Sequence, residues 1–95
     1  MAQGNKWNSS HRSQVEIIAD ILQAAVEGAK KTHIMYGCNL SFGQLQTYLD
    51  LLVDKGLLKT ISARGRVGNP GFFRTTARGQ SFLQVYQNIR GLLTS

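Results

Sequence analysis

The stretch SFGQLQTYLDLLVDKG, residues 41–56, carries the clearest helix signal of the chain. Ser41 and Gln44 form a capping box, in which each side chain satisfies a backbone N–H group that the start of a helix leaves unpaired. Gly56 is a natural end for the helix. The apolar residues between them have the spacing i, i+3, i+4, i+7 and i+8 of one buried helix face: Leu45, Tyr48, Leu49, Leu52 and Val53. The stretch therefore predicts a helix over about 42–55.

Two more helices are predicted on the N-terminal side of this stretch. Ser13 and Glu16 form another capping box, and the apolar residues behind them are helically spaced, so a helix is expected to end near Gly28. A short helix is expected over residues 32–36, with Gly37 as its left-handed stop.

The pattern changes after the third helix. Residues 57–62 and 72–75 are predicted to pair as strands of a β-hairpin, because residues 63–71 between them are too rich in glycine and proline for regular structure. Thr76 is then expected to cap a last helix that ends near Leu93.

This order predicts a mainly α fold with a small β-hairpin (α+β). Three helices, a basic hairpin and a C-terminal helix are the layout of a winged helix-turn-helix. We expect a flexible tail over 1–12, the winged helix-turn-helix over 13–76 and a C-terminal helix for dimerisation over 77–95.

The charge of the chain is unevenly distributed. Eleven Lys and Arg residues oppose five Asp and Glu residues, for a net charge of +6, and no acidic residue follows Asp54. The acid-free part carries seven basic residues: Lys55, Lys59, Arg64, Arg66, Arg74, Arg78 and Arg90. Such a one-sided basic region favours a polyanionic partner, which means DNA, RNA or an anionic membrane surface.

Several classes of protein are not expected. Cys38 is the only cysteine, which excludes an intrachain disulfide and a cysteine-based zinc site, and it is expected to fill a small gap in the core. No metal site, cofactor or small-molecule ligand is indicated. With two histidines and no paired carboxylates in an obvious pocket, the chain is not expected to be an enzyme. No signal peptide or membrane span is evident, so a cytoplasmic, nucleoid-associated protein is expected.

Two segments resemble a known family. They are KTHIMYGCNLSFGQLQTYLDLLVDKGLL (31–58) and FFRTTARGQSFL (72–83), and the likeness extends over residues 15–93. They are similar to the small archaeal winged helix-turn-helix DNA-binding proteins, which include chromosomal proteins of about ten kilodaltons and many presumed transcriptional regulators. The resemblance implies DNA binding and dimerisation through the C-terminal helix. In the chromosomal proteins that helix forms an antiparallel coiled coil, but here it is short.

The candidate DNA contacts come from three places in the chain. The recognition helix, about 42–55, offers polar side chains that suit base edges, although any amphipathic helix exposes such residues. The start of the short helix suits a phosphate, and the hairpin tip suits a groove or backbone, although its arginines would also be at home in solvent. Asp50 is expected to point away from phosphates. The predicted residues are Lys30, Lys31, Thr32, His33, Ser41, Gly43, Gln44, Gln46, Thr47, Arg64, Arg66 and Arg74.

The last helix carries a candidate dimer seam. Its apolar residues follow a 3-4-3 spacing, the pattern of two-helix packing, with Leu83 nearer the opposite side. The alternative is that this face completes the core of the monomer. The predicted interface residues are Phe82, Val85, Tyr86, Ile89, Leu92 and Leu93.

The expected function is binding of double-stranded DNA as a homodimer, through the recognition helix and the basic wing (63–71), in transcriptional regulation. Two alternatives remain open at this point. One is a sequence-nonspecific chromatin protein, and the other is a winged helix that binds a protein and not DNA.

Overall fold

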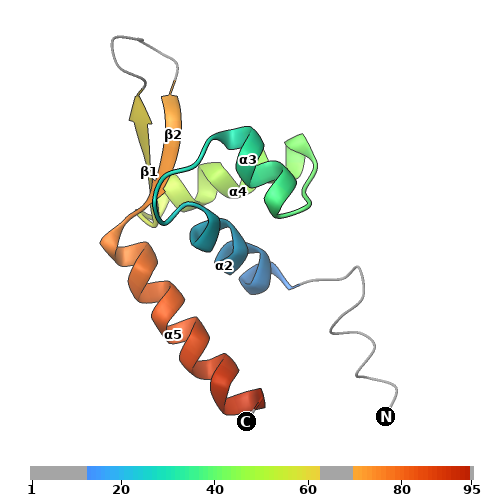
Figure 1. The fold of residues 1–95 in the computed structure, drawn as a ribbon, viewed down its shortest axis with the longest axis vertical. Helices are drawn as coiled ribbons and strands as arrows, with labels where there is room; N and C mark the ends of the chain where they lie inside the picture. Colours follow the sequence, from blue (N-terminus) through green and yellow to red (C-terminus); the bar gives the residue numbers. More distant parts are fainter. Residues whose placement is uncertain (1–12, 63–69, 95) are drawn as a thin grey trace.

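The computed structural model describes residues 13–62 and 70–94. Three helices precede a two-stranded antiparallel hairpin and a long helix follows it, which confirms the expected winged helix-turn-helix order (Figure 1). The elements are α2 (Gln14–Ala24), α3 (Lys31–Gly37), α4 (Phe42–Asp54), β1 (Leu58–Ser62), β2 (Pro70–Thr75) and α5 (Ala77–Thr94).

Both predicted capping boxes are present. At the start of α2, the Glu16 N–H donates to Ser13 Oγ at 3.1 Å and the Ser13 N–H donates back to Glu16 Oε1 at 3.0 Å. Ser41 and Gln44 repeat this exchange at the start of α4, again at 3.1 and 3.0 Å. The predicted cap of the last helix is confirmed too, because Thr76 Oγ1 accepts the N–H of Gly79 at 3.1 Å.

Two helix ends differ from the prediction. Gly37 is the last residue of α3 and is not left-handed, while Asn39 has the positive φ of 56° that turns the chain towards α4. Asparagine tolerates this conformation because its short polar side chain bonds locally. Helix α2 ends at Ala24, before Gly28, since the carbonyl of Ala25 accepts the N–H of Thr75 at 2.9 Å.

Strand β2 is bonded along both of its edges. One edge pairs with β1 in antiparallel register, with Leu58 opposite Thr75 and Thr60 opposite Phe73. On the other edge Phe73 exchanges two backbone hydrogen bonds with Ala29, at 2.8 and 2.9 Å. The base of the hairpin is therefore joined to the segment between α2 and α3.

The core lies where α2, α3 and α4 meet the hairpin. The predicted α4 stripe is confirmed for three of its five residues, because Leu45, Leu49 and Leu52 are fully buried. Val53 is exposed, contrary to the prediction, since it lies at the edge of the stripe beside the hairpin. The largest fully buried side chains are Ile21, Leu22, Ile34, Leu45, Leu49, Leu52 and Leu58.

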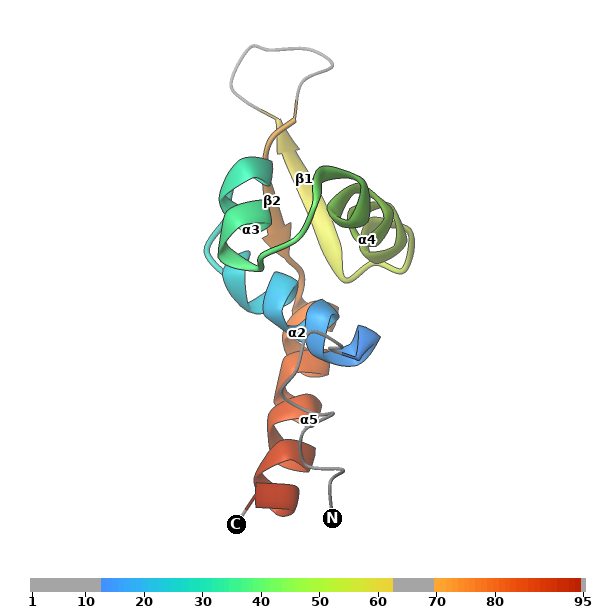
Figure 2. The ribbon, with the colours of Figure 1, turned by 90° about the vertical axis from the view of Figure 1, so that its right-hand side faces the viewer.

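Helix α5 packs on the domain through its N-terminal part, as far as Tyr86 and Gln87. A Cβ at Gly79 would lie 2.4 Å from the carbonyl oxygen of Leu57, so only glycine allows this close approach. One turn later Leu83 is buried in the core of its own chain, on the side of α5 opposite the exposed seam residues Val85 and Ile89, as predicted. Figures 1 and 2 show the second half of α5 extending away from the other helices.

Candidate nucleic-acid interface

The start of α3 and the first turns of α4 meet at one side chain. Lys31 donates a hydrogen bond from Nζ to Gln46 Oε1, and its Nζ lies 4.3 Å from the ring centroid of Phe42. The Lys31 ammonium is thus directed at α4, whereas Lys30 and His33 are exposed. Thr32, the remaining residue predicted here for DNA, is exposed as well.

Two exposed side chains of α4 are partly engaged within the helix. The Gln44 oxygen accepts the N–H of Ser41, so a contact made by Gln44 with both amide groups would compete with the cap. The hydroxyl of Thr47 donates to the carbonyl of Gly43 at 3.1 Å. Because the hydroxyl is engaged, Thr47 would contact a partner mainly through its methyl group.

Gly43 has no steric reason to be glycine within the chain. It is exposed in the first turn of α4, and an added Cβ would meet no atom of another described element within 4 Å. Glycine inside a helix is about 0.5–1 kcal/mol less favourable than alanine. A glycine that is neither strained nor crowded suits a surface that another molecule approaches closely.

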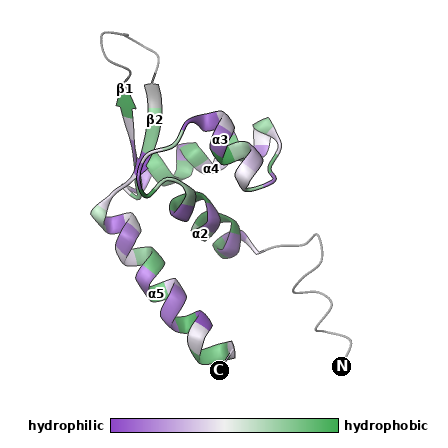
Figure 3. Cartoon of the chain, viewed as in Figure 1, coloured by the Kyte–Doolittle hydropathy of each residue, from purple (hydrophilic) through white to green (hydrophobic). Residues whose placement is uncertain are grey.

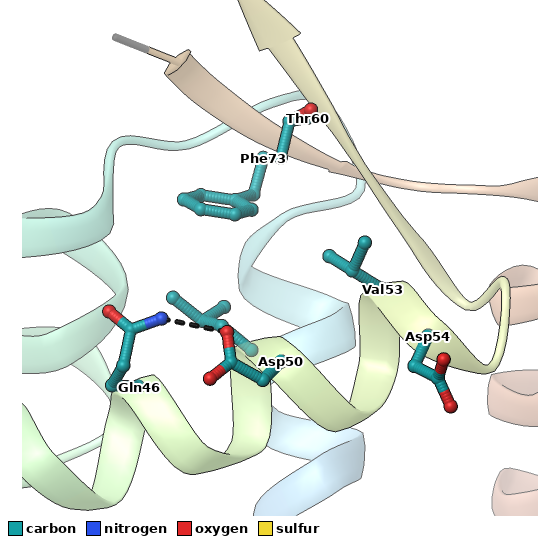
Figure 4. A pocket seen from close by; sticks show the side chains of 7 residues that line it. Gln46, Asp50, Val53, Asp54, Thr60 and Phe73 are labelled. Carbon is teal, nitrogen blue, oxygen red and sulfur yellow. Dashed lines mark hydrogen bonds between the residues drawn. The ribbon is translucent and has the colours of Figure 1, made fainter. Parts of the chain in front are cut away.

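A groove of about 420 Å³ separates α4 from the hairpin (Figure 4). Thr60 and Phe73 line it from the strands. Asp50 lies on its α4 side and accepts a hydrogen bond from Gln46 Nε2 at 2.9 Å. Asp50 thus shares the helix face of Gln46, while its orientation towards phosphates stays a prediction. Asp54 lines the same groove one turn further on.

The hairpin separates one predicted DNA contact from those on α4. Arg74 lies opposite Lys59 in the strand register, and both are exposed. Because side chains alternate along a strand, this pair lies on the face away from the groove-lining Thr60 and Phe73. Lys59 was not predicted as a site residue, because its pairing with Arg74 depends on the register. Arg64 and Arg66 lie outside the described residues.

The predicted seam of α5 divides into two parts. Phe82 and Tyr86 are half buried and pack against the core of their own chain. Hydrophobic and hydrophilic residues alternate along α5, and its last turn is hydrophobic (Figure 3), while the remaining seam residues are exposed. Their exposed fractions are 56% for Val85, 52% for Ile89, 81% for Leu92 and 80% for Leu93.

Over residues 13–62 and 70–94, no three His, Cys, Asp or Glu side chains gather closely enough to hold a metal ion. Within the same part of the chain, no helix is both long and apolar enough to cross a membrane.

Comparison with known proteins agrees with this architecture. The chain is similar to Sso10a-2, described as a DNA-binding protein from Sulfolobus solfataricus, with 27% identity, a TM-score of 0.69 and coverage of 86% of this chain and 85% of the other. It is 43% identical over 56 residues to an uncharacterized protein of Methanocaldococcus jannaschii, a match that covers 58% of each chain. The model of the winged helix-turn-helix family matches residues 11–94. The chain therefore belongs to the winged helix-turn-helix family.

Proposed function

We propose that this protein binds double-stranded DNA through α4 and the hairpin. The observation that carries the proposal is the surface of the first two turns of α4. This surface presents Gly43, Gln46 and Thr47, and the helix has no carboxylate before Asp50. Hydrogen-bonding and methyl groups without negative charge are what the edges of base pairs require of a helix in the major groove.

The cations of the hairpin support the same function. Lys59 and Arg74 lie side by side on an exposed face, and seven basic residues follow Asp54 with no acid among them. Phosphate contacts from such residues supply most of the sequence-independent affinity for DNA. The similarity to the DNA-binding protein Sso10a-2 is consistent with this function.

A protein partner in place of DNA has less support. An apolar patch on α4 would favour it. Phe42 is exposed at the start of that helix, but the Lys31 ammonium lies beside its ring. The aromatic side chain is thus part of a cationic surface, which suits a polyanion better than an apolar protein.

We further propose that the protein acts as a homodimer through α5 and regulates transcription. The exposed side chains of Val85, Ile89 and Leu92 keep the 4-3 part of the predicted spacing along a helix about 27 Å long. The apolar surface continues into a groove of about 480 Å³ that Leu57, Phe82 and Val85 line. An exposed stripe of this kind is typical of an interface. A two-fold dimer would present two copies of α4 to paired, palindromic half-sites about one helical turn apart.

A titration of duplex DNA at several salt concentrations tests the proposal. The wild type should bind with an affinity that falls steeply with salt, and the double variant Arg64→Ala/Arg66→Ala should flatten the log–log slope by about two units if both arginines contact phosphates. An unchanged slope in the variant would remove the hairpin tip from the interface. Absence of binding by the wild type at low salt would overturn DNA binding itself.

A further inference from the structure

The amide of Gln46 is held at both of its ends. Lys31 Nζ donates to the Gln46 oxygen, and the Gln46 nitrogen donates to Asp50 Oδ1 at 2.9 Å, the bond drawn in Figure 4. An ammonium group is only a donor and a carboxylate is only an acceptor. The opposite orientation of the amide would bring two donors together at Lys31 and two acceptors together at Asp50. The two neighbours therefore select one orientation of the Gln46 amide.

The groups that remain free on Gln46 are complementary to adenine. A glutamine oxygen accepts two hydrogen bonds and its NH₂ group donates two. Lys31 occupies one acceptor site of the oxygen and Asp50 one N–H donor, so Gln46 retains one acceptor site and one donor. In the major groove adenine presents the donor N6–H₂ and the acceptor N7, the pair that a glutamine amide binds through two hydrogen bonds. Gln44 is less suited, because its oxygen already accepts the N–H of Ser41 in the helix cap.

Asp50 has little structural reason to be acidic. It is exposed, and a Gln–Asp pair four residues apart on a helix contributes only about 0.2–0.5 kcal/mol. A carboxylate on a helix that enters the major groove also lowers the affinity for phosphates. Its hydrogen bond to Gln46, in contrast, favours recognition of a base, because it orients the Gln46 amide.

We propose that Asp50 and Lys31 are positioning residues that orient Gln46 to read an adenine. This inference rests on the proposed DNA binding, and it adds the base read and the two side chains that determine it. Asp50 acts through its bond to Gln46 and not through a contact of its own with the base. Loss of either neighbour weakens this selection, and an amide that turns over presents its donor and acceptor in the wrong order for adenine.

The test begins with selection of duplexes from a randomised library by the wild type and by Gln46→Ala. The position whose preference disappears in Gln46→Ala is the one that Gln46 reads, and we expect adenine there. Affinities for duplexes with each of the four bases at this position are then measured for Asp50→Ala, Lys31→Met and the control Asp54→Ala. The control removes the same charge from the same groove, but Asp54 is not the acceptor of the Gln46 bond.

Asp50→Ala should lower the preference for adenine over the next base by roughly twofold or more, which is part of the about 5- to 150-fold discrimination of a two-bond contact. Lys31→Met should do the same, and Asp54→Ala should keep the wild-type preference. Thermal unfolding by circular dichroism checks that each variant is folded. Should Asp50→Ala not fold, Lys31→Met against Asp54→Ala provides the same comparison.

Three results would overturn the inference while DNA binding stands. They are a preference for a base other than adenine at the Gln46-dependent position, equal discrimination by the Asp50 and Asp54 variants, and wild-type binding that no base change alters. Failure of the wild type to bind any duplex would instead overturn the proposed function, and the inference with it.

Discussion

Lys59 and Arg74 occupy directly opposed positions on β1 and β2, and both side chains are exposed. Opposed residues of an antiparallel pair bring their Cβ atoms to within about 5.5 Å, and like charges at such positions destabilise the sheet. The free hairpin therefore holds a repulsive pair, which a bound phosphate group would neutralise.

Lys59→Gln should stabilise the free protein and weaken its complex with DNA. We expect a gain of about 0.2–1 kcal/mol in the free energy of unfolding by urea, largest at low salt, because the repulsion is screened at high salt. In DNA titrations the log–log salt slope should fall by about one unit. Lys55→Gln is the control for stability, since Lys55 lies outside the strands. A destabilised Lys59 variant would contradict the repulsion.

Gly43→Ala should have opposite effects on folding and on binding. Alanine should raise the free energy of unfolding by about 0.5–1 kcal/mol, because nothing crowds a Cβ at this position. The added methyl group should lower DNA affinity, since it occupies the space between α4 and the duplex. Gly91→Ala, in the equally open environment of α5, should stabilise without loss of affinity. Unchanged binding by Gly43→Ala would show that the first turn of α4 does not approach the DNA.

Gln44→Ala should affect the stability of α4 and leave the base preference intact. The variant removes half of the capping box, a loss of roughly 0.3–1.5 kcal/mol in denaturant unfolding. A companion variant, Gln46→Ala, should unfold almost as the wild type does, yet lose about 1–3 kcal/mol at the preferred site. If preferred and random duplexes lose affinity equally in Gln46→Ala, the side chain positions the protein without reading sequence, which favours a chromatin-like role.

Ile89→Glu should convert the proposed dimer into a folded monomer. Ile89 is half exposed in the isolated chain, so a carboxylate there disturbs an intermolecular contact and not the core. Sedimentation equilibrium should show half the mass, with an unchanged circular dichroism spectrum and weaker DNA binding. Gln84→Glu places the same charge off the seam and should remain dimeric. A wild type that sediments as a monomer at tens of micromolar would contradict the dimer.

The elements were predictable where their signals are local. The capping boxes of Ser13 and Ser41 each involve residues three apart, so the sequence alone places the start of both helices. Thr76 marks the start of α5 in the same way. The order of elements then followed from these starts and from the glycine-rich connections.

The errors occur where distant segments decide the outcome. The end of α2 depends on a hydrogen bond from Thr75, and the buried side of α5 depends on the fit of Gly79 against Leu57. Neither partner is near in sequence. The sequence did not show that Phe82 and Tyr86, which were assigned to the seam, also pack against the core of their own chain.

The candidate site was predictable in its residue types and less so in its connections. The spacing of four between Gln46 and Asp50 is the known spacing of a helical side-chain pair, so this contact was within reach of the sequence. The Lys31 contact and the opposition of Lys59 and Arg74 required the packing of α3 on α4 and the strand register. Both arise from tertiary structure alone.

The double bonding of β2 has a consequence for how the hairpin moves. Phe73 and Thr75 donate their amide protons to Ala29 and Ala25, so these protons should exchange with deuterated water only when the whole domain unfolds. Strand β1, which within residues 13–62 and 70–94 pairs only along its β2 edge, should exchange by local fraying. The base of the hairpin is therefore held rigidly by these bonds, while the rest of the hairpin extends from it. A duplex that pulls on it transmits the load to α2 and to the segment before α3, and does not bend the hairpin at its base.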